Sequence, residues 1–302
     1  MKSEAIVELG KPLQTVETET PTPKGKEVLL KITHSGVCHS DVHIHDGYFD
    51  LGGGNKLPVG AMLNLPHTMG HEIEGEVVSI GSDVKDVEIG SNVVAYPWIG
   101  CGNCSTCSDG DEHYCNAPRQ LGIQLPGGFA DYCIVPDSKY ILDYDGIRPG
   151  LAATYMCSGL TAFGALKKIV NISDKDHILI MGLGGVGMMG LQFAKSLFNC
   201  KILAADIDPN KLQAAKGAGA DEIYDTSDEQ SLKKLLEDTG GGVKATVDFV
   251  GAEKTLQYCL DSTKKGGQVV VVGLFGGGFQ MPIPMFPLSA KSIGGSFVGS
   301  LE

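Results

Sequence analysis

The 302-residue chain has no apolar run of the roughly 18 residues that a membrane-spanning helix requires. Its start, Met1 to Val7, lacks the apolar core of a signal peptide, so we expect a cytoplasmic protein. Basic residues are scarce: 24 Lys and Arg against 36 Asp and Glu give a net charge of −12. This balance disfavours binding to nucleic acid or to an anionic membrane. The sequence also lacks internal repeats and low-complexity tracts.

The composition that is present is that of a soluble protein with a full core: 42% hydrophobic and 20% charged residues. The length predicts about two domains of roughly 100–200 residues each. Nine cysteines are available. In a reducing compartment they are expected to be metal ligands or free thiols rather than disulfides.

The first half reads as short strands without intervening helices, which predicts an antiparallel, partly closed, mostly-β domain over residues 1–152. The strands are expected at 28–32, 75–81, 93–96 and 132–135. Within this domain a separate lobe is expected at about 97–117.

The second half, 153–302, alternates strands and helices and therefore predicts a doubly wound parallel (Rossmann) sheet. Asp208-Pro209 is a strong helix start, and Ser227 to Gln230 has the pattern of a capping box. The expected strands are 177–181, 201–205, 245–250, 268–273 and 292–298, and helices are expected from 186 to 197 and near 253–263.

A glycine-rich turn, Gly182-Leu183-Gly184-Gly185-Val186-Gly187, follows one of these strands directly and opens a helix. That context is typical of a dinucleotide-binding loop, in which backbone N–H groups at the helix start meet a pyrophosphate. Asp206, at the end of the next strand, would accept hydrogen bonds from ribose hydroxyls and repel a 2′-phosphate, so NAD is favoured over NADP. Lys211 could also reach the ribose or be a solvated helix lysine. The alternative is a glycine turn with no ligand.

Four cysteines, Cys101, Cys104, Cys107 and Cys115, stand within fifteen residues, with glycines that let the chain wrap. Four thiolates satisfy tetrahedral zinc and leave no open position, which predicts a structural zinc site. An iron–sulfur cluster is the rival interpretation.

A second group of reactive side chains runs from Cys38 to His43. Together with His71 and Cys157, Cys38 would make a set of three zinc ligands with the fourth place open, as catalytic zinc requires. Cys157 is expected at the junction between the domains. Each of these residues could instead be buried without a metal.

These motifs, in this order, resemble those of zinc-dependent alcohol dehydrogenases in the medium-chain dehydrogenase/reductase superfamily. The resemblance covers about residues 5–300. It implies a GroES-like catalytic domain and a Rossmann coenzyme domain, two zinc ions per chain, NAD, and reversible oxidation of an alcohol to an aldehyde or ketone. In this resemblance Cys38, His71 and Cys157 hold the catalytic zinc.

The resemblance also implies roles for the neighbours of those ligands. Asp41 would orient His71, and Glu72 would lie behind the metal as a transient ligand or an ion-pair partner. Ser40 would take the alcohol proton and pass it towards His43. The cofactor would meet His39 at its pyrophosphate and the backbone of Phe297 at its carboxamide.

Three expectations concern the rest of the chain. Tyr48 and Trp98 would border the substrate pocket, with ordinary packing as the alternative. Family members usually continue for roughly forty more residues, so we expect a C-terminal segment to be missing. A homodimer or homotetramer is expected, because residues 281–298 lie where relatives pair their sheets.

Two other functions remain open on the sequence. A polyol or sugar dehydrogenase of the same superfamily is the first, although Cys157 and the complete cysteine lobe argue against it. The second is an inactive truncated relative that serves as a binding or structural protein.

Overall fold

The computed structural model describes residues 1–301, which divide into two compact units. The first contains Met1–Phe49, Leu57–Leu160 and the chain from Ser300 on, and the second contains Asp50–Lys56 and Thr161–Gly299. Across the described residues, none of the helices combines the length and the apolar character that crossing a membrane demands.

The first unit is built on antiparallel strands. A five-stranded sheet has the order β10-β8-β7-β3-β9, and a three-stranded sheet has the order β2-β1-β6. The strands are β1 Lys2–Ile6, β2 Gln14–Glu17, β3 Val28–Gly36, β6 His67–Thr68, β7 Glu72–Ile80, β8 Asn92–Ala95, β9 Tyr132–Val135 and β10 Ile141–Asp143. A hairpin, β4 Tyr48–Gly52 and β5 Asn55–Pro58, is inserted after the first helix, and its tip groups with the second unit.

The helices that begin in this unit are short. They are α1 His39–Asp46, α2 Ser105–Ser108 and α3 Ala152–Thr154, the π-turn η4 Tyr155–Gly159, and α4 Leu160–Lys167, which continues into the second unit. Single 3-10 turns are η1 Gly60–Met62, η2 Glu112–Tyr114 and η3 Ser138–Tyr140.

The register of β3 against β7 brings two of the predicted site segments together. Gly36, the last residue of β3, pairs with Glu72, the first residue of β7. In an antiparallel pair the end of one strand lies beside the start of the other. The segment that follows β3 and the residue that precedes β7 therefore lie at the same end of this strand pair. This brings Cys38 and His71 close.

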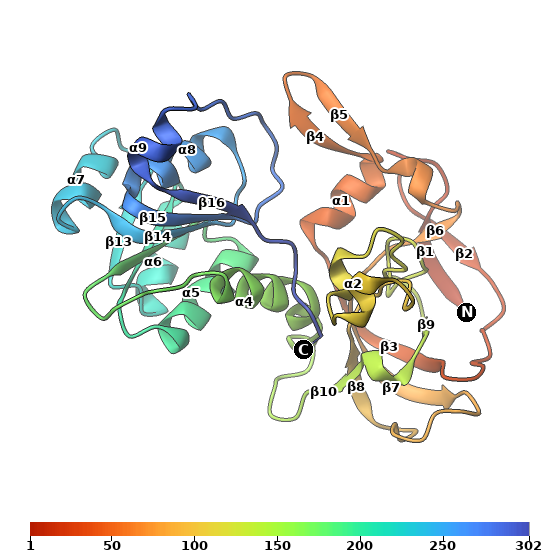
Figure 1. The fold of residues 1–302 in the computed structure, drawn as a ribbon. Helices are drawn as coiled ribbons and strands as arrows, with labels where there is room; N and C mark the ends of the chain where they lie inside the picture. The colour runs from red at the N-terminus through yellow and green to blue at the C-terminus, as the bar shows by residue number, and fades with distance from the viewer. Residues whose placement is uncertain (302) are drawn as a thin grey trace. The chain divides into compact units, whose positions relative to one another are not determined.

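The second unit is a six-stranded parallel sheet with the order β13-β12-β11-β14-β15-β16. In chain order this is 3-2-1-4-5-6, the Rossmann arrangement. Figure 1 shows these strands lying side by side with helices packed around them. The strands are β11 His177–Met181, β12 Lys201–Asp206, β13 Glu222–Asp225, β14 Val243–Asp248, β15 Thr263–Val271 and β16 Ser292–Gly295, and the helices are α5 Gly185–Leu197, α6 Pro209–Gly217, α7 Ser231–Asp238, α8 Glu253–Ser262 and α9 Met285–Ser289.

Alternation along β11 divides the core of this unit between the two faces of its sheet. Ile178 and Ile180 belong to one buried cluster, and Leu179 and Met181 to another. Successive side chains of a strand point to opposite faces, so a strand buried on both sides reads as a continuous apolar run. The run at 177–181 was the basis of the predicted parallel strand, and it is confirmed residue for residue.

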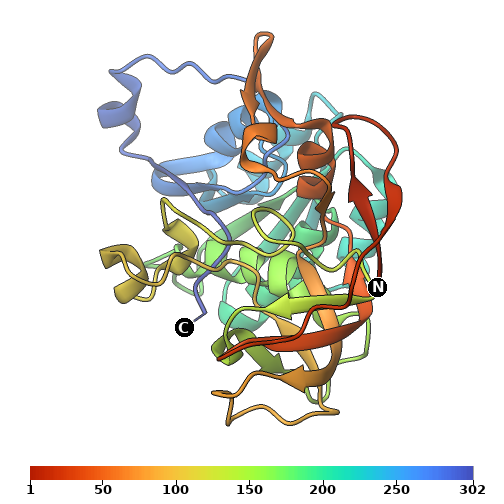
Figure 2. The same cartoon turned by 90° about the vertical axis from the view of Figure 1, so that its right-hand side faces the viewer.

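Some predicted elements differ from the structure. The capping box at Ser227 is wrong, because α7 begins at Ser231 and the Ser227 backbone and hydroxyl bond to Asp225 in a local turn. The strand predicted at 268–273 starts earlier, at Thr263, and the last strand is shorter than 292–298. The connection from β15 to β16, which contains α9, swings out as a long loop (Figure 2).

Candidate functional site

Helix α1 follows β3 directly and presents the reactive stretch. Cys38 is its N-cap residue, and its backbone N–H donates to Asp41 Oδ2 at 2.9 Å. A carboxylate in the first turn also favours the positive end of the helix dipole. The helix ends at Gly47, whose φ of 81° suits glycine and whose N–H bonds to the carbonyls of His43 and Ile44. The helix is therefore defined at both ends by local sequence.

Three of the predicted ligands gather at one point. The ligand atoms of Cys38, His71 and Cys157 all lie within 4.8 Å of one another. His71 is fully buried and Cys157 is buried in the π-turn η4, a type of turn that is frequent at functional sites. The two sulfurs are 3.8 Å apart, so they are not disulfide-bonded.

This geometry fits zinc. Two thiolates bound tetrahedrally at about 2.3 Å each would be separated by about 3.8 Å, the distance found between Cys38 and Cys157. His71 Nε2 is buried and has no hydrogen-bond partner in the described part of the chain. A buried polar atom without a hydrogen-bond partner is costly, and a metal ion would satisfy this nitrogen. Three protein ligands leave the fourth position open.

The buried carboxylate of Asp41 lies behind both ligands. Its Oδ1 atom is 3.2 Å from His71 Nδ1, while its Oδ2 atom holds the backbone of Cys38. A metal-binding imidazole commonly has its other nitrogen beside a carboxylate, which fixes the ring orientation and the tautomer. Asp41 therefore serves two of the three ligands at once.

Protonation in this group is coupled. A hydrogen bond from the Cys157 thiol, opposed by burial and assisted by His71, lowers the pKa of Cys38 to about 3. The same contact, with burial, raises the pKa of Cys157 well above its usual value. Burial alone would lower the pKa of His71, but the contacts with Asp41 and Cys38 outweigh it and raise it to about 10. A bound cation would displace these protons.

Glu72 lies beside the π-turn η4, which carries Cys157. Its Oε1 atom accepts hydrogen bonds from the Ser158 hydroxyl at 2.8 Å and from the Ser158 backbone at 3.3 Å. Its Oε2 atom fills the place where a side chain at Gly36 would lie, since a Cβ there would be only 1.9 Å away. Burial raises the pKa of Glu72 against the opposing effect of Ser158.

Three further polar residues of α1 have predicted roles and are less buried than Asp41. His39 is exposed, and Ser40 and His43 are half-buried. His39 and His43 are one turn apart, with ring centroids separated by 4.9 Å, and the His43 ring lies 4.7 Å from that of Phe49.

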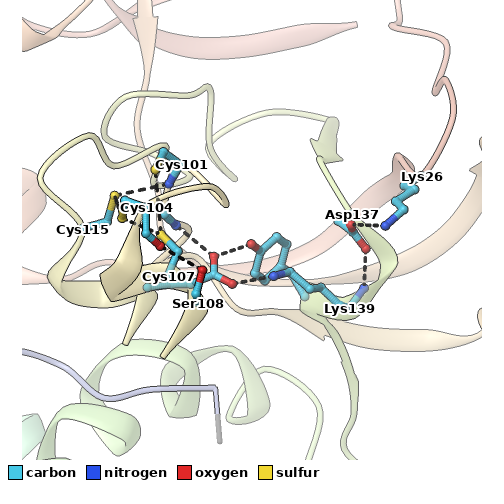
Figure 3. Close-up of polar contacts among 11 residues, drawn as sticks. Lys26, Cys101, Cys104, Cys107, Ser108, Cys115, Asp137 and Lys139 are labelled. Atoms are coloured by element: carbon cyan, nitrogen blue, oxygen red, sulfur yellow. Dashed lines mark hydrogen bonds and ion pairs between the residues drawn. The ribbon is translucent and has the colours of Figure 1, made fainter. Parts of the chain in front are cut away.

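The four cysteines of the predicted lobe also converge. The distances between sulfurs are 3.5 Å for Cys104 and Cys107, 3.8 Å for Cys104 and Cys115, and 3.9 Å for Cys101 and Cys107. Figure 3 shows the four sulfur atoms turned towards one another. These distances again match the separation of about 3.8 Å expected around a tetrahedral zinc ion.

The ionisation of this set is uneven without a cation. Hydrogen bonds from the backbone and from neighbouring thiols lower the pKa of Cys101 to about 6, whereas burial and the other sulfurs raise the pKa of Cys107 to about 12. All four thiols therefore ionise together only when a positive ion lies between them.

A buried carboxylate, Glu112, fastens this lobe to the 3-10 turn η3 between β9 and β10. It accepts hydrogen bonds from the Gly100 backbone at 3.1 Å, from Lys139 Nζ at 2.5 Å and from the Tyr140 hydroxyl. These donors outweigh burial and lower the pKa of Glu112. Lys139 lies next to the lobe, with Asp137 and Lys26 beyond it (Figure 3).

The glycine loop has two kinds of glycine. Gly182 has a φ of +85°, and a Cβ at Gly187 would lie 1.7 Å from the Gly182 carbonyl oxygen, so packing requires both. A Cβ at Gly184 or Gly185 would meet nothing within 4 Å. Gly184 and Gly185 are thus not required by packing. They leave the N-terminus of the thirteen-residue helix α5 open, as a dinucleotide phosphate needs, with Val186 half-buried in its first turn.

Asp206 ends β12 next to this loop. Its carboxylate accepts backbone hydrogen bonds from Leu183 at 2.6 Å, Ile207 at 2.8 Å and Asp208 at 3.0 Å. A carboxylate has about four acceptor sites, so one stays available to a ribose hydroxyl. Lys211 is exposed on α6, and Phe297 is 42% exposed after β16.

The two predicted pocket residues have different surroundings. Tyr48 is half-buried at the start of β4, whereas Trp98 is only 3% exposed and lies against His71.

Two residues of these sites, Ser158 and Glu112, were not predicted from the sequence. Ser158 stood beside the identified Cys157, but its bond to Glu72 joins positions 86 residues apart.

Comparisons with known proteins give a family match in each of the two units. Residues 24–144 match the family model of the alcohol dehydrogenase GroES-like domain, and residues 185–302 match that of the zinc-binding dehydrogenases. An NAD-dependent alcohol dehydrogenase of Saccharolobus solfataricus is 38% identical over 302 residues, covering 99% of this chain and 86% of the relative. The chain therefore belongs to the zinc-binding alcohol dehydrogenases of the medium-chain dehydrogenase/reductase superfamily.

Solved structures place the fold in the same group. A crystal structure of an NAD-dependent alcohol dehydrogenase has a TM-score of 0.89 at 27% identity, covering 100% of this chain and 86% of that one. The D-arabinose dehydrogenase of Sulfolobus solfataricus has a TM-score of 0.87 at 26% identity, covering 100% and 90%. The predicted fold class, a GroES-like unit with a Rossmann unit, is confirmed.

Proposed function

We propose that this chain catalyses the reversible oxidation of an alcohol to an aldehyde or ketone, with NAD as the hydride acceptor. The observation that carries the proposal is the buried set of Cys38, His71 and Cys157, which has zinc spacing, one position left open and Asp41 behind it. The family and the NAD-dependent alcohol dehydrogenases that it resembles support the same activity.

Two zinc ions per chain are part of the proposal. Cys38, His71 and Cys157 would hold the catalytic ion, and Cys101, Cys104, Cys107 and Cys115 the structural one. When bound, the catalytic zinc supplies a Lewis acid that makes the alcohol oxygen easier to deprotonate. The four-cysteine set offers no open position, so its role would be to stabilise the lobe.

The protein's own groups would manage the proton. Ser40, half-buried on α1, would accept it from the alcohol and pass it towards His43, one turn further along the helix. Asp41 faces the ligands instead and keeps His71 oriented. Glu72 would adjust the charge behind the metal through its contact with Ser158.

The cofactor would bind on the second unit. The open start of α5, at Gly184 and Gly185, suits the pyrophosphate, with Val186 in the same turn and Gly182 and Gly187 shaping the loop. Asp206 would accept a ribose hydroxyl, with Lys211 near it. His39 would meet the phosphates, and the backbone of Phe297 would meet the carboxamide.

Several wider features belong to the same proposal. We divide the chain into a catalytic domain, 1–152, and a coenzyme domain, 153–302. A homodimer or homotetramer in the cytoplasm is proposed. Tyr48 and Trp98 would border the substrate.

The test is a panel of primary, secondary, benzylic and polyol alcohols and aldoses with NAD and NADP, followed by absorbance of the reduced cofactor. We expect turnover with a simple alcohol and NAD. Turnover restricted to aldoses would favour the sugar dehydrogenase alternative, to which the D-arabinose dehydrogenase likeness points. No turnover with any alcohol in the zinc-loaded chain would contradict the proposal.

A further inference from the structure

Trp98 is the single tryptophan of the chain and is 3% exposed. It stands between β8 and Cys101, on a segment that is fastened on both sides. The Pro97 and Ile99 carbonyls accept backbone hydrogen bonds from Leu121 and Arg119, at 3.1 Å and 2.8 Å. The indole therefore extends from a backbone segment that hydrogen bonds hold in place on both sides.

The indole reaches two of the segments that carry the candidate metal ligands. Its Nε1–H donates to the Met156 carbonyl at 2.9 Å, and Met156 directly precedes Cys157 in the π-turn. Its ring meets the His71 ring edge-on, with centroids 5.4 Å apart and planes at 60°. This edge-on geometry is one that aromatic rings prefer.

We propose that Trp98 is a positioning residue for the three-ligand site, holding the His71 ring and the Cys157 turn at metal-binding spacing. The inference rests on the proposed function. Asp41 constrains His71 from its Nδ1 side and Cys38 through its backbone. Trp98 connects His71 to the third ligand, because one rigid side chain contacts both the imidazole and the turn that bears Cys157.

The role differs from lining a substrate pocket. A pocket residue acts by its shape towards the substrate, so its replacement changes substrate affinity and leaves the metal alone. A positioning residue acts through the ligands, and replacing such a neighbour typically weakens metal binding about 10- to 100-fold. The two roles are therefore separated by a measurement on the metal without substrate.

The experiment uses the full chain, stripped of metal and loaded with Co²⁺, whose visible bands report ligand geometry. The bands of the three-ligand site are those that the variant His71→Ala loses. Trp98→Phe keeps an aromatic ring but removes the N–H donor to Met156, and Trp98→Leu removes both contacts. For each variant the bands and the rate of Co²⁺ removal by EDTA are measured.

We expect shifted bands and about tenfold faster Co²⁺ removal from this site in Trp98→Phe, and a larger effect in Trp98→Leu. Tyr224→Phe is the matched control, since the buried Tyr224 loses one hydrogen bond, to Asp238, within the other unit. It should match the wild type. If Trp98→Leu does not fold, Trp98→Phe alone decides.

Two results would overturn the inference in distinguishable ways. Unchanged bands and release rates in the Trp98 variants, with the His71→Ala difference present, would remove the positioning role and leave the proposed function standing. Identical spectra for the wild type and His71→Ala would remove the three-ligand site itself, and both proposals with it.

Discussion

The carboxylate Oδ1 of Asp41 lies 3.2 Å from Nδ1 of His71, and both side chains are buried. The other oxygen of the same carboxylate accepts the backbone N–H of Cys38 at 2.9 Å. One acidic residue thus orients one candidate ligand and fixes the backbone of another.

Replacing Asp41 should therefore weaken metal binding. Asp41→Asn keeps the size of the side chain but removes the charge that faces His71. We expect zinc affinity of the three-ligand site to fall about 10- to 100-fold, measured by competition with a chelating dye. Asp46→Asn is the control, because Asp46 contacts His45 on the exposed side of the same helix and should leave zinc affinity unchanged. An Asp41→Asn affinity equal to that of the wild type would contradict this role.

Alanine substitutions at two glycines of the same loop should have different effects, one on stability and the other on NAD affinity. Gly187→Ala places a Cβ 1.7 Å from the Gly182 carbonyl and should destabilise the fold by several kcal/mol, as overpacking does. Gly184→Ala meets no protein atom within 4 Å, so the melting temperature should stay the same while the Kd for NAD rises about tenfold or more. Calorimetry and NAD titration measure the two effects. An unchanged NAD affinity in Gly184→Ala would argue against a pyrophosphate there.

The stability of the four-cysteine lobe should depend on the buried carboxylate of Glu112. Glu112→Gln removes the charge that Lys139, Tyr140 and Gly100 share. We expect a loss of about 2 kcal/mol in the free energy of unfolding, the range for hydrogen bonds to a charged group. Urea unfolding of the zinc-loaded chain measures it, and Asp109→Asn, at an exposed position in the same lobe, is the control. Equal stability of Glu112→Gln and the wild type would show that the anchor is dispensable.

Acid should weaken the second unit through Asp176. Its carboxylate accepts a hydrogen bond from Lys264 Nζ at 2.6 Å, and this contact lowers its pKa well below the usual value. A lowered folded-state pKa gives stability that is present above about pH 4 and is lost as the pH falls through that range. Lys264→Gln should cost about 1 kcal/mol at neutral pH, and the cost should vanish in acid. Lys265→Gln, at the exposed neighbouring position, is the control. A cost that did not change with pH would contradict the pairing.

Sequence patterns predicted those strands and helix ends that depend only on residues close together in the chain. Strand β11 was predicted at its full length, and Asp208 caps α6 as expected, through its bond to the Asn210 backbone. The helix at α5 was predicted too, but three of its four buried residues are small: they are Gly187, Gly190, Leu191 and Ala194. The ring of Phe249 packs where a side chain at Gly190 would lie, and the Gly182 carbonyl occupies that place for Gly187, which only the tertiary structure reveals.

The site was predicted unevenly for the same reason. The ligand types and spacings stand in the sequence, so both metal groups could be identified, and the structure brings each group together. The link from Trp98 to Met156 spans 58 residues, and the bond from Ser158 to Glu72 spans 86. Such contacts depend on how separate strands and helices pack, and no periodicity in the sequence encodes them.

The most direct test of the central claim is the zinc content of the purified chain compared with that of a double variant, Cys38→Ser with His71→Ala. The account predicts two zinc ions per wild-type chain, one for each ligand group. The double variant should keep only the ion of the four-cysteine lobe and should lose alcohol-dependent NADH formation. Equal zinc content in the two proteins would contradict the account.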